Sequence, residues 1–158
     1  MDPRLSLRFP RHRRLWPQVT AALDGDLDIA HDAEHVLRVY RWALRLAEAE
    51  RLDADLAGAA ALVHDLVNIP KESADRPLAS SLSAACGAEV LPDAGYTPDE
   101  VDAIVEAVRT CSWSRGQPPT TPLGAILQDA DRLDAIGAIG VLRGAACAQG
   151  MAGRSSGT

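Results

Sequence analysis

The stretch AAALVHDLV, residues 59–67, decides how the rest of this chain is interpreted. It is apolar except for His64 and Asp65, so it predicts a buried helix, which we place over about residues 53–67. Pro70 limits that helix, because the residue before a proline is disfavoured in helical geometry. The small residues in the middle of the helix would let neighbouring helices approach it closely.

Apolar residues recur at helical spacing on both sides of this stretch. The clearest start signal is Thr97-Pro98-Asp99-Glu100, a capping box with proline at the first helical position. Asp53 is a suitable N-cap for the buried helix. The ranges predicted as helical are about 32–50, 53–67, 78–91, 98–110 and, as a pair, 122–147.

Composition points to the same fold class. Hydrophobic residues make up 47% of the 158 residues but aromatic residues only 4%, so the core must be mostly Ala, Leu, Val and Ile. Ala and Leu are strong helix formers, and no segment shows sustained alternation with β-branched residues. We therefore expect an all-α fold, a compact bundle of six to seven helices in one domain.

Charge and cysteine content exclude several classes of function. A formal net charge of −6 argues against a nucleic-acid polymer as partner, because gripping a phosphate backbone requires a basic face. No apolar run is long enough to span a membrane. Cys86, Cys111 and Cys147 are odd in number and lack C-x-x-C spacing, which argues against a disulfide framework and favours a cytoplasmic location.

Arginines crowd the first residues of the chain. The simpler interpretation is a solvated leading segment, and the alternative is an arm that attracts anions near an active site. The arginines are Arg4, Arg8, Arg11, Arg13 and Arg14.

His64 and Asp65 are the first candidates for chemistry. Two ionisable residues in so apolar a run are costly to bury alone, but neighbouring helix positions about 100° apart could both reach one cation. Taken alone, the pair is better explained by a hydrogen-bonded core histidine beside a surface aspartate. His31 and His35 lie four residues apart and could chelate a metal, although polarity at a helix start explains them equally well. His31 falls at the start of the helix, so His35 is the better buried candidate.

The third candidate group is Asp129, Asp131 and Asp134 in an otherwise apolar run. Asp129 and Asp131 would point in opposite directions on a helix, whereas Asp131 and Asp134 share one side. A solvated acidic face is the alternative, but Arg132 is the only compensating charge there.

The three groups in this order resemble the HD-domain superfamily of metal-dependent phosphohydrolases. The motifs are His35-x-x-Arg-Val, then His64-Asp65, then Ala-Asp131-Arg-Leu-Asp, and the resemblance covers about residues 28–142. Residues 68–73, Asn-Ile-Pro-Lys-Glu-Ser, and the run 128–140 are similar to a small stand-alone bacterial type within that superfamily. We expect an Arg-rich segment with a short helix over residues 1–27, the metal-binding helical domain over 28–148 and a disordered tail over 149–158, which is small and polar.

The resemblance also implies a site. The metal ligands would be His35, His64, Asp65 and Asp131, holding one divalent ion of Mn, Fe, Co, Ni or Zn. His64 and Asp65 would be the catalytic residues, with Asp65 or a neighbouring carboxylate accepting the proton of a water molecule. The substrate would be a small phosphorylated metabolite, with a nucleotide as the first candidate. Its phosphate contacts would come from the nearby cations Lys71, Arg76, Arg115 and Arg132, although a surface charge explains each one individually.

Some features depart from the family pattern and keep alternatives open. Cys111 stands where relatives of this type often carry a histidine, and relatives usually extend further at the C-terminus, so a second copy in a homo-oligomer could supply part of a pocket wall. The four histidines are His12, His31, His35 and His64, and the lack of any after position 64 argues against a two-metal site and an oxygenase or lyase. The main alternative is a non-catalytic, metal-stabilised helical module for binding or regulation.

Overall fold

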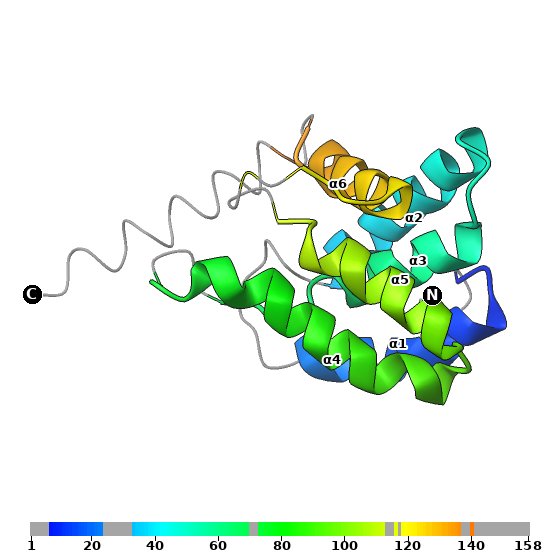
Figure 1. Cartoon of the computed structure of the whole chain (residues 1–158), viewed down its shortest axis with the longest axis horizontal. Helices are drawn as coiled ribbons and strands as arrows, with labels where there is room; N and C mark the ends of the chain where they lie inside the picture. Colours follow the sequence, from blue (N-terminus) through cyan, green and yellow to red (C-terminus); the bar gives the residue numbers. More distant parts are fainter. Residues whose placement is uncertain are drawn as a thin grey trace, which may run out of the picture.

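The computed structural model describes residues 7–23, 33–69, 73–112, 116, 118–136 and 140. Within these residues the chain forms six α-helices, one short 3-10 helix and no strand, which confirms the all-α bundle (Figure 1). No helix in the described part is long and apolar enough to cross a membrane. The helices are α1 (Pro10–Leu23), α2 (Ala33–Ala49), α3 (Ala54–Val63), η3 (Arg76–Leu78), α4 (Ala79–Ala94), α5 (Pro98–Arg109) and α6 (Pro122–Asp134).

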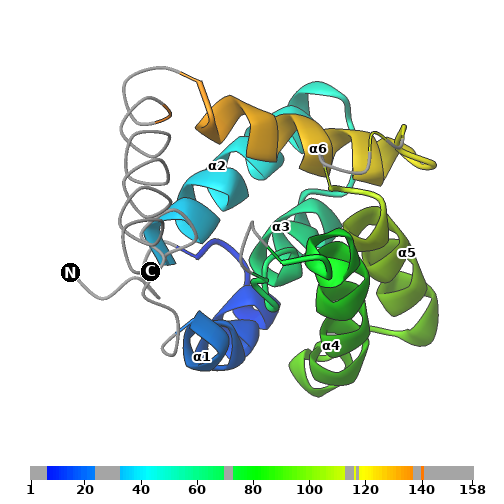
Figure 2. The same ribbon diagram turned by 90° about the vertical axis from the view of Figure 1, so that its left-hand side faces the viewer.

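Helix α3 is the centre of the bundle. It packs against α1, α2, α4, α5 and α6, and the view in Figure 2 shows it surrounded by them. Every residue from Ala57 to Val63 is buried, as expected for a helix that is apolar on all sides. The small side chains of this helix leave room for neighbours to approach from every direction.

The predicted helix starts are confirmed. The side chain of Asp53 accepts hydrogen bonds from the backbone N–H groups of Asp55 and Leu56, 2.8 and 3.3 Å away. Thr97 and Glu100 form the reciprocal capping box at the start of α5. These caps satisfy N–H groups that have no acceptor within a helix.

Two predicted helix ends are wrong. Helix α3 stops at Val63 instead of Val67, because the N–H of Val67 donates to Oγ of Ser83 on α4 (3.0 Å) and so is not available for a helical bond. Helix α4 continues through Pro92 to Ala94, where Gly95 ends it at φ 95°, a left-handed conformation that glycine adopts without steric cost. The predicted boundary at 27/28, the tail 149–158 and most of 137–147 lie outside the described residues.

Arginines of the leading segment contact other helices, although Arg8, Arg13 and Arg14 are exposed, as expected for a solvated segment. Arg8 pairs with Glu48 on α2, and Arg14 donates to the carbonyl of Ala94 (2.8 Å). Arg11 binds Glu100 (2.9 Å) and Asp55 (3.1 Å). Arg4 lies outside the described residues.

His12 anchors α1 in the core. Its Nε2 lies 2.9 Å from the carbonyl of Asp55 and 3.0 Å from Oδ1 of the same residue, so Nε2 carries the proton. Its Nδ1 accepts from the hydroxyl of Tyr40 (2.9 Å), and that hydroxyl accepts from the N–H of Arg8 (2.8 Å). The neutral ring therefore satisfies both of its nitrogens although it is 0% exposed.

Two buried glycines allow a test of how closely the helices pack: Gly58 on α3 faces α1 and α2, and Gly87 on α4 faces α3. A Cβ at Gly58 would lie too close to Cε1 of His12 and 2.8 Å from Cε2 of Tyr40, whereas a Cβ at Gly87 meets its nearest neighbour, Val63, at 3.4 Å. We expect Gly58→Ala to lower the free energy of unfolding by about 1–3 kcal/mol through overpacking. The control Gly87→Ala, also within a helix, should raise it by up to about 1 kcal/mol through helix propensity. Urea denaturation measures both, and a Gly58→Ala variant as stable as wild type would contradict this packing.

His12 should also make the fold sensitive to acid. Burial lowers the pKa of His12, against hydrogen bonds to Asp55 that raise it. The unfolded chain therefore takes up a proton as the pH falls through about 6.5, and the folded chain does so only at lower pH. Stability is complete above the unfolded pKa and declines as the pH falls below it. We expect His12→Gln to flatten this decline in urea denaturation at several pH values, and an unchanged slope would rule out His12 as its source.

Candidate metal centre

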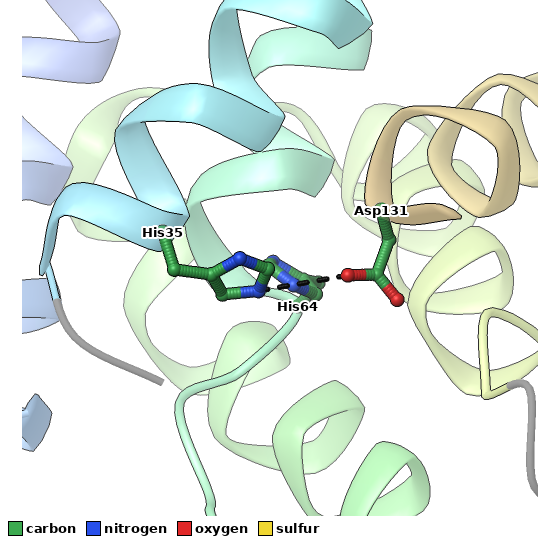
Figure 3. A group of neighbouring side chains, drawn as sticks. All are labelled: His35, His64 and Asp131. Carbon is green, nitrogen blue, oxygen red and sulfur yellow. Dashed lines mark ion pairs between the residues drawn. The ribbon is translucent and has the colours of Figure 1, made fainter. Parts of the chain in front are cut away.

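Three helices and one turn bring the candidate ligands together. His35 lies in the first turn of α2, His64 is the C-cap of α3, Asp65 follows it, and Asp131 lies on α6. Figure 3 shows the imidazoles of His35 and His64 close to each other, with the carboxylate of Asp131 approaching from α6. The early end of α3 means that Asp65 reaches this cluster from a turn and not from a helix.

The donor atoms lie at distances that one ion could span. Nε2 of His35 is 3.5 Å from Oδ2 of Asp65 and 3.5 Å from Oδ1 of Asp131, and Nε2 of His64 is 3.6 Å from Oδ2 of Asp65. Ligand atoms of His35, His64 and Asp131 all lie within 4.8 Å of one another. Two ligands of one ion, each at about 2.1 Å, can be at most about 4.2 Å apart, so the three N···O distances fit a shared ion. They are too long for hydrogen bonds.

The proton on His64 is fixed away from the cluster. Its Nδ1 lies 2.8 Å from the carbonyl oxygen of Ala61, which can only accept, so Nδ1 carries the proton and the neutral ring keeps its lone pair on Nε2. That Nε2 atom is buried and makes no hydrogen bond within the described part of the chain. A buried polar atom without a hydrogen bond is costly, and a metal ion at this point would satisfy it. The residues therefore fit a bound cation.

His35 is oriented by Asp134 on α6. Its Nδ1 lies 2.7 Å from Oδ2 of Asp134, and Arg38 donates from Nε to Oδ1 of the same carboxylate (2.6 Å). Burial opposes ionisation of Asp134, but hydrogen bonds from His35 and Arg38 outweigh it and hold the pKa of this carboxyl well below its usual range. The ionised Asp134 accepts a hydrogen bond from the Nδ1–H group of His35. The lone pair of the ring is therefore on Nε2, the atom that faces Asp65 and Asp131.

Burial divides the cluster into an inner and an outer half. The side chains of His35 and His64 are 1% and 2% exposed, whereas those of Asp65 and Asp131 are 22% and 35% exposed. The cluster therefore opens to solvent on its carboxylate side. Two imidazoles and two carboxylates form a mixed N/O donor set that suits Mn²⁺, Fe²⁺, Co²⁺, Ni²⁺ or Zn²⁺.

Cys111 lies close to this cluster. Burial raises the pKa of its thiol most, and the negative charges of Asp65 and Asp131 raise it further. The thiol is therefore protonated near neutral pH and is a poor nucleophile.

The two described cations that were predicted to contact substrate, Arg76 and Arg132, are held by neighbouring residues. Arg76 donates to Oδ1 of Asn68 (3.0 Å) and to the carbonyl of Ile69 (2.6 Å), so it braces the segment that follows Asp65. Arg132, which follows Asp131 on α6, donates to Oε1 of Gln128 (2.8 Å) and pairs with Asp129 (3.5 Å). Lys71 and Arg115 lie outside the described residues, as does His31.

Asp134 and Arg38 are the site residues that sequence reasoning did not assign. The signal was present in their spacing, because each lies three residues after a predicted ligand, Asp131 or His35, and so on the same side of its helix. What the sequence could not supply is the pairing between the two helices.

The sequence and the fold both resemble known proteins. Residues 32–136 match the HD domain family. YpgQ from Bacillus subtilis (strain 168) is 34% identical over 134 residues, which are 82% of this chain and 62% of YpgQ, so the chain spans less than two thirds of that relative.

Solved structures agree with the family match. A predicted HD superfamily hydrolase from an uncultured Thermotogales bacterium superposes with a TM-score of 0.71 at 33% identity, over 90% of this chain and 79% of the other. A protein from Lactobacillus plantarum gives 0.72 at 28% identity, over 92% and 66% of the two chains. YpgQ in complex with ADP gives 0.61 at 29% identity, over 89% and 64%.

Bound metal can be measured without any knowledge of the reaction. We expect the protein, purified without added metal, to contain about one transition-metal ion per chain by elemental analysis. The double variant His64→Ala, Asp65→Ala should contain none. Asp129→Asn is the control, because Asp129 is exposed on α6 and its side chain is 63% accessible. Two results together would contradict the site: wild-type protein that contains no metal, and a melting temperature that does not rise with added Mn²⁺, Co²⁺, Ni²⁺ or Zn²⁺.

Proposed function

The chain belongs to the HD domain family, and from this premise we propose that it is a metal-dependent phosphohydrolase acting on a small phosphorylated metabolite, with a nucleotide as the first candidate. The observation that carries the proposal is the convergence of His35, His64, Asp65 and Asp131 with both imidazole lone pairs on Nε2. A divalent ion held there would polarise a phosphoryl oxygen and lower the pKa of water.

The chain's own residues would divide the remaining work. The two buried histidines hold the cation in a fixed place, and the more exposed carboxylates face the side from which substrate and water approach. A carboxylate oxygen of Asp65 that is not on the metal could accept the proton of the attacking water. Its neighbour His64, whose Nδ1 is engaged by Ala61, can act only through Nε2.

Cations near the cluster would hold the phosphate. Arg76 is anchored by Asn68, and Arg132 by Gln128 and Asp129, so their guanidinium groups are held in place before a substrate arrives. Lys71 and Arg115 belong to the same proposal from the sequence. A nucleotide is the first candidate because YpgQ has been crystallised with ADP. A homo-oligomer, predicted from the sequence, is part of this proposal.

Release of inorganic phosphate tests the reaction. We expect hydrolysis of at least one member of a panel of nucleotides and phosphate esters, assayed with the ion that the protein retains. Asp65→Asn should lower kcat by about 10²-fold or more, because it removes both a metal ligand and the proton acceptor. Asp102→Asn, an exposed carboxylate on α5, should leave kcat unchanged.

The alternative function is a non-catalytic module in which the metal only stabilises the bundle. The buried thiol of Cys111, near Asp65 and Asp131, favours this alternative, because a protonated thiol cannot act as a base in the reaction. This alternative predicts a rise in melting temperature with added metal and no turnover above background on the whole panel. Turnover that disappears in Asp65→Asn would exclude it.

A further inference from the structure

The imidazole of His35 is held between two aspartates of the same helix. Its Nε2 faces Oδ1 of Asp131 at 3.5 Å, and its Nδ1 faces Oδ2 of Asp134 at 2.7 Å. Asp131 and Asp134 are three residues apart on α6, so they lie on one side of that helix. One ring on α2 therefore contacts α6 through both of its nitrogens.

Arg38 fixes the second of these aspartates. It donates from Nε to Oδ1 of Asp134 (2.6 Å) and from Nη2 to Oδ2 (3.2 Å), a bidentate arrangement that determines how the carboxylate is turned. Arg38 lies on α2, three residues after His35. The carboxylate of Asp134 is 2% exposed, so it accepts these three hydrogen bonds in a site nearly closed to water.

We propose that Asp134 is a positioning residue of the metal centre, with two effects that one carboxylate exerts together. It fixes His35 with the proton on Nδ1, and it sets where α6, and therefore Asp131, lies against α2. This inference rests on the metal site of the proposed function. Outer-shell carboxylates of this kind orient a histidine ligand and raise its basicity.

The amide of asparagine has the same shape but cannot replace this carboxylate. If its oxygen faces His35, its NH₂ group meets the donors of Arg38. If its NH₂ group faces His35, then Nδ1 must accept, and the ring proton moves to Nε2, where it blocks the metal. In either orientation two buried groups that should form a hydrogen bond cannot do so. The Asp134→Asn variant therefore changes the hydrogen bonding at this position and leaves the side-chain volume almost the same.

Titration of Mn²⁺ and of Co²⁺ into metal-free protein by calorimetry is the first test. We expect Asp134→Asn to bind both ions about 10–100-fold more weakly than wild type. Asp129→Asn is the matched control, because it makes the same change of charge on the same helix at an exposed position, and it should bind like wild type. A merely structural role would lower the melting temperature of metal-free Asp134→Asn and leave its Kd unchanged, and that result would overturn the proposal.

The tautomer of His35 gives a second test that needs no metal. Side-chain ¹H–¹⁵N correlation spectra of metal-free wild type should show the Nδ1–H tautomer for His35 and the Nε2–H tautomer for His12, which serves as internal reference. An Nε2–H tautomer for His35 would overturn the proposal even if the Asp134→Asn variant fails to fold. Wild-type protein that binds neither ion would overturn the proposed function, while the spectra would still decide the role of Asp134.

Discussion

The site depends on two buried imidazoles. The Nδ1–H group of each already donates a hydrogen bond to a fixed acceptor. Ala61 provides that acceptor for His64 within its own chain segment, and Asp134 provides it for His35 from another helix. Both rings must then present Nε2 to the same point. In an apolar core this arrangement is costly unless a cation fills the point between them.

The scaffold explains how two histidines can meet inside so small a protein. Helix α3 is made almost entirely of small apolar residues, so the helices around it can pack close to its axis. Its early end turns the chain at His64, which lets Asp65 reach the cluster from a turn. The hydrogen bond between Val67 and Ser83 holds that turn against α4, so the bundle and the site share the same contacts.

Most of the helices and the metal-ligand candidates could be predicted from the sequence. The features that could not be predicted all depend on contacts between residues that are distant in the chain. Periodicity, the N-cap at Asp53 and the capping box at Thr97 are local signals, and they located the helices and their starts. The end of α3 depends on the hydrogen bond between Val67 and Ser83, sixteen residues apart, and the orientation of His35 depends on Asp134, ninety-nine residues away. Contacts at such separations leave no periodic trace. The same reason explains why the ion pairs of Arg8 with Glu48 and of Arg11 with Glu100, on distant helices, could not be predicted.

Charge sets a further condition on any phosphorylated substrate. The chain has a net charge of −6, and the cluster itself contains the two partly exposed carboxylates Asp65 and Asp131, so an anion would be repelled unless positive charge is concentrated locally. Arg8 and Arg11 do not provide it, because they are engaged with Glu48, Asp55 and Glu100. The remaining sources near the site are a cation bound at the cluster and side chains such as Arg76, which is anchored by neutral groups of Asn68 and Ile69, and Arg132, which also pairs with Asp129 at 3.5 Å. A phosphate held between such a cation and these guanidinium groups would be recognised mainly through its charge. The rest of the metabolite would be bound by the segments around them.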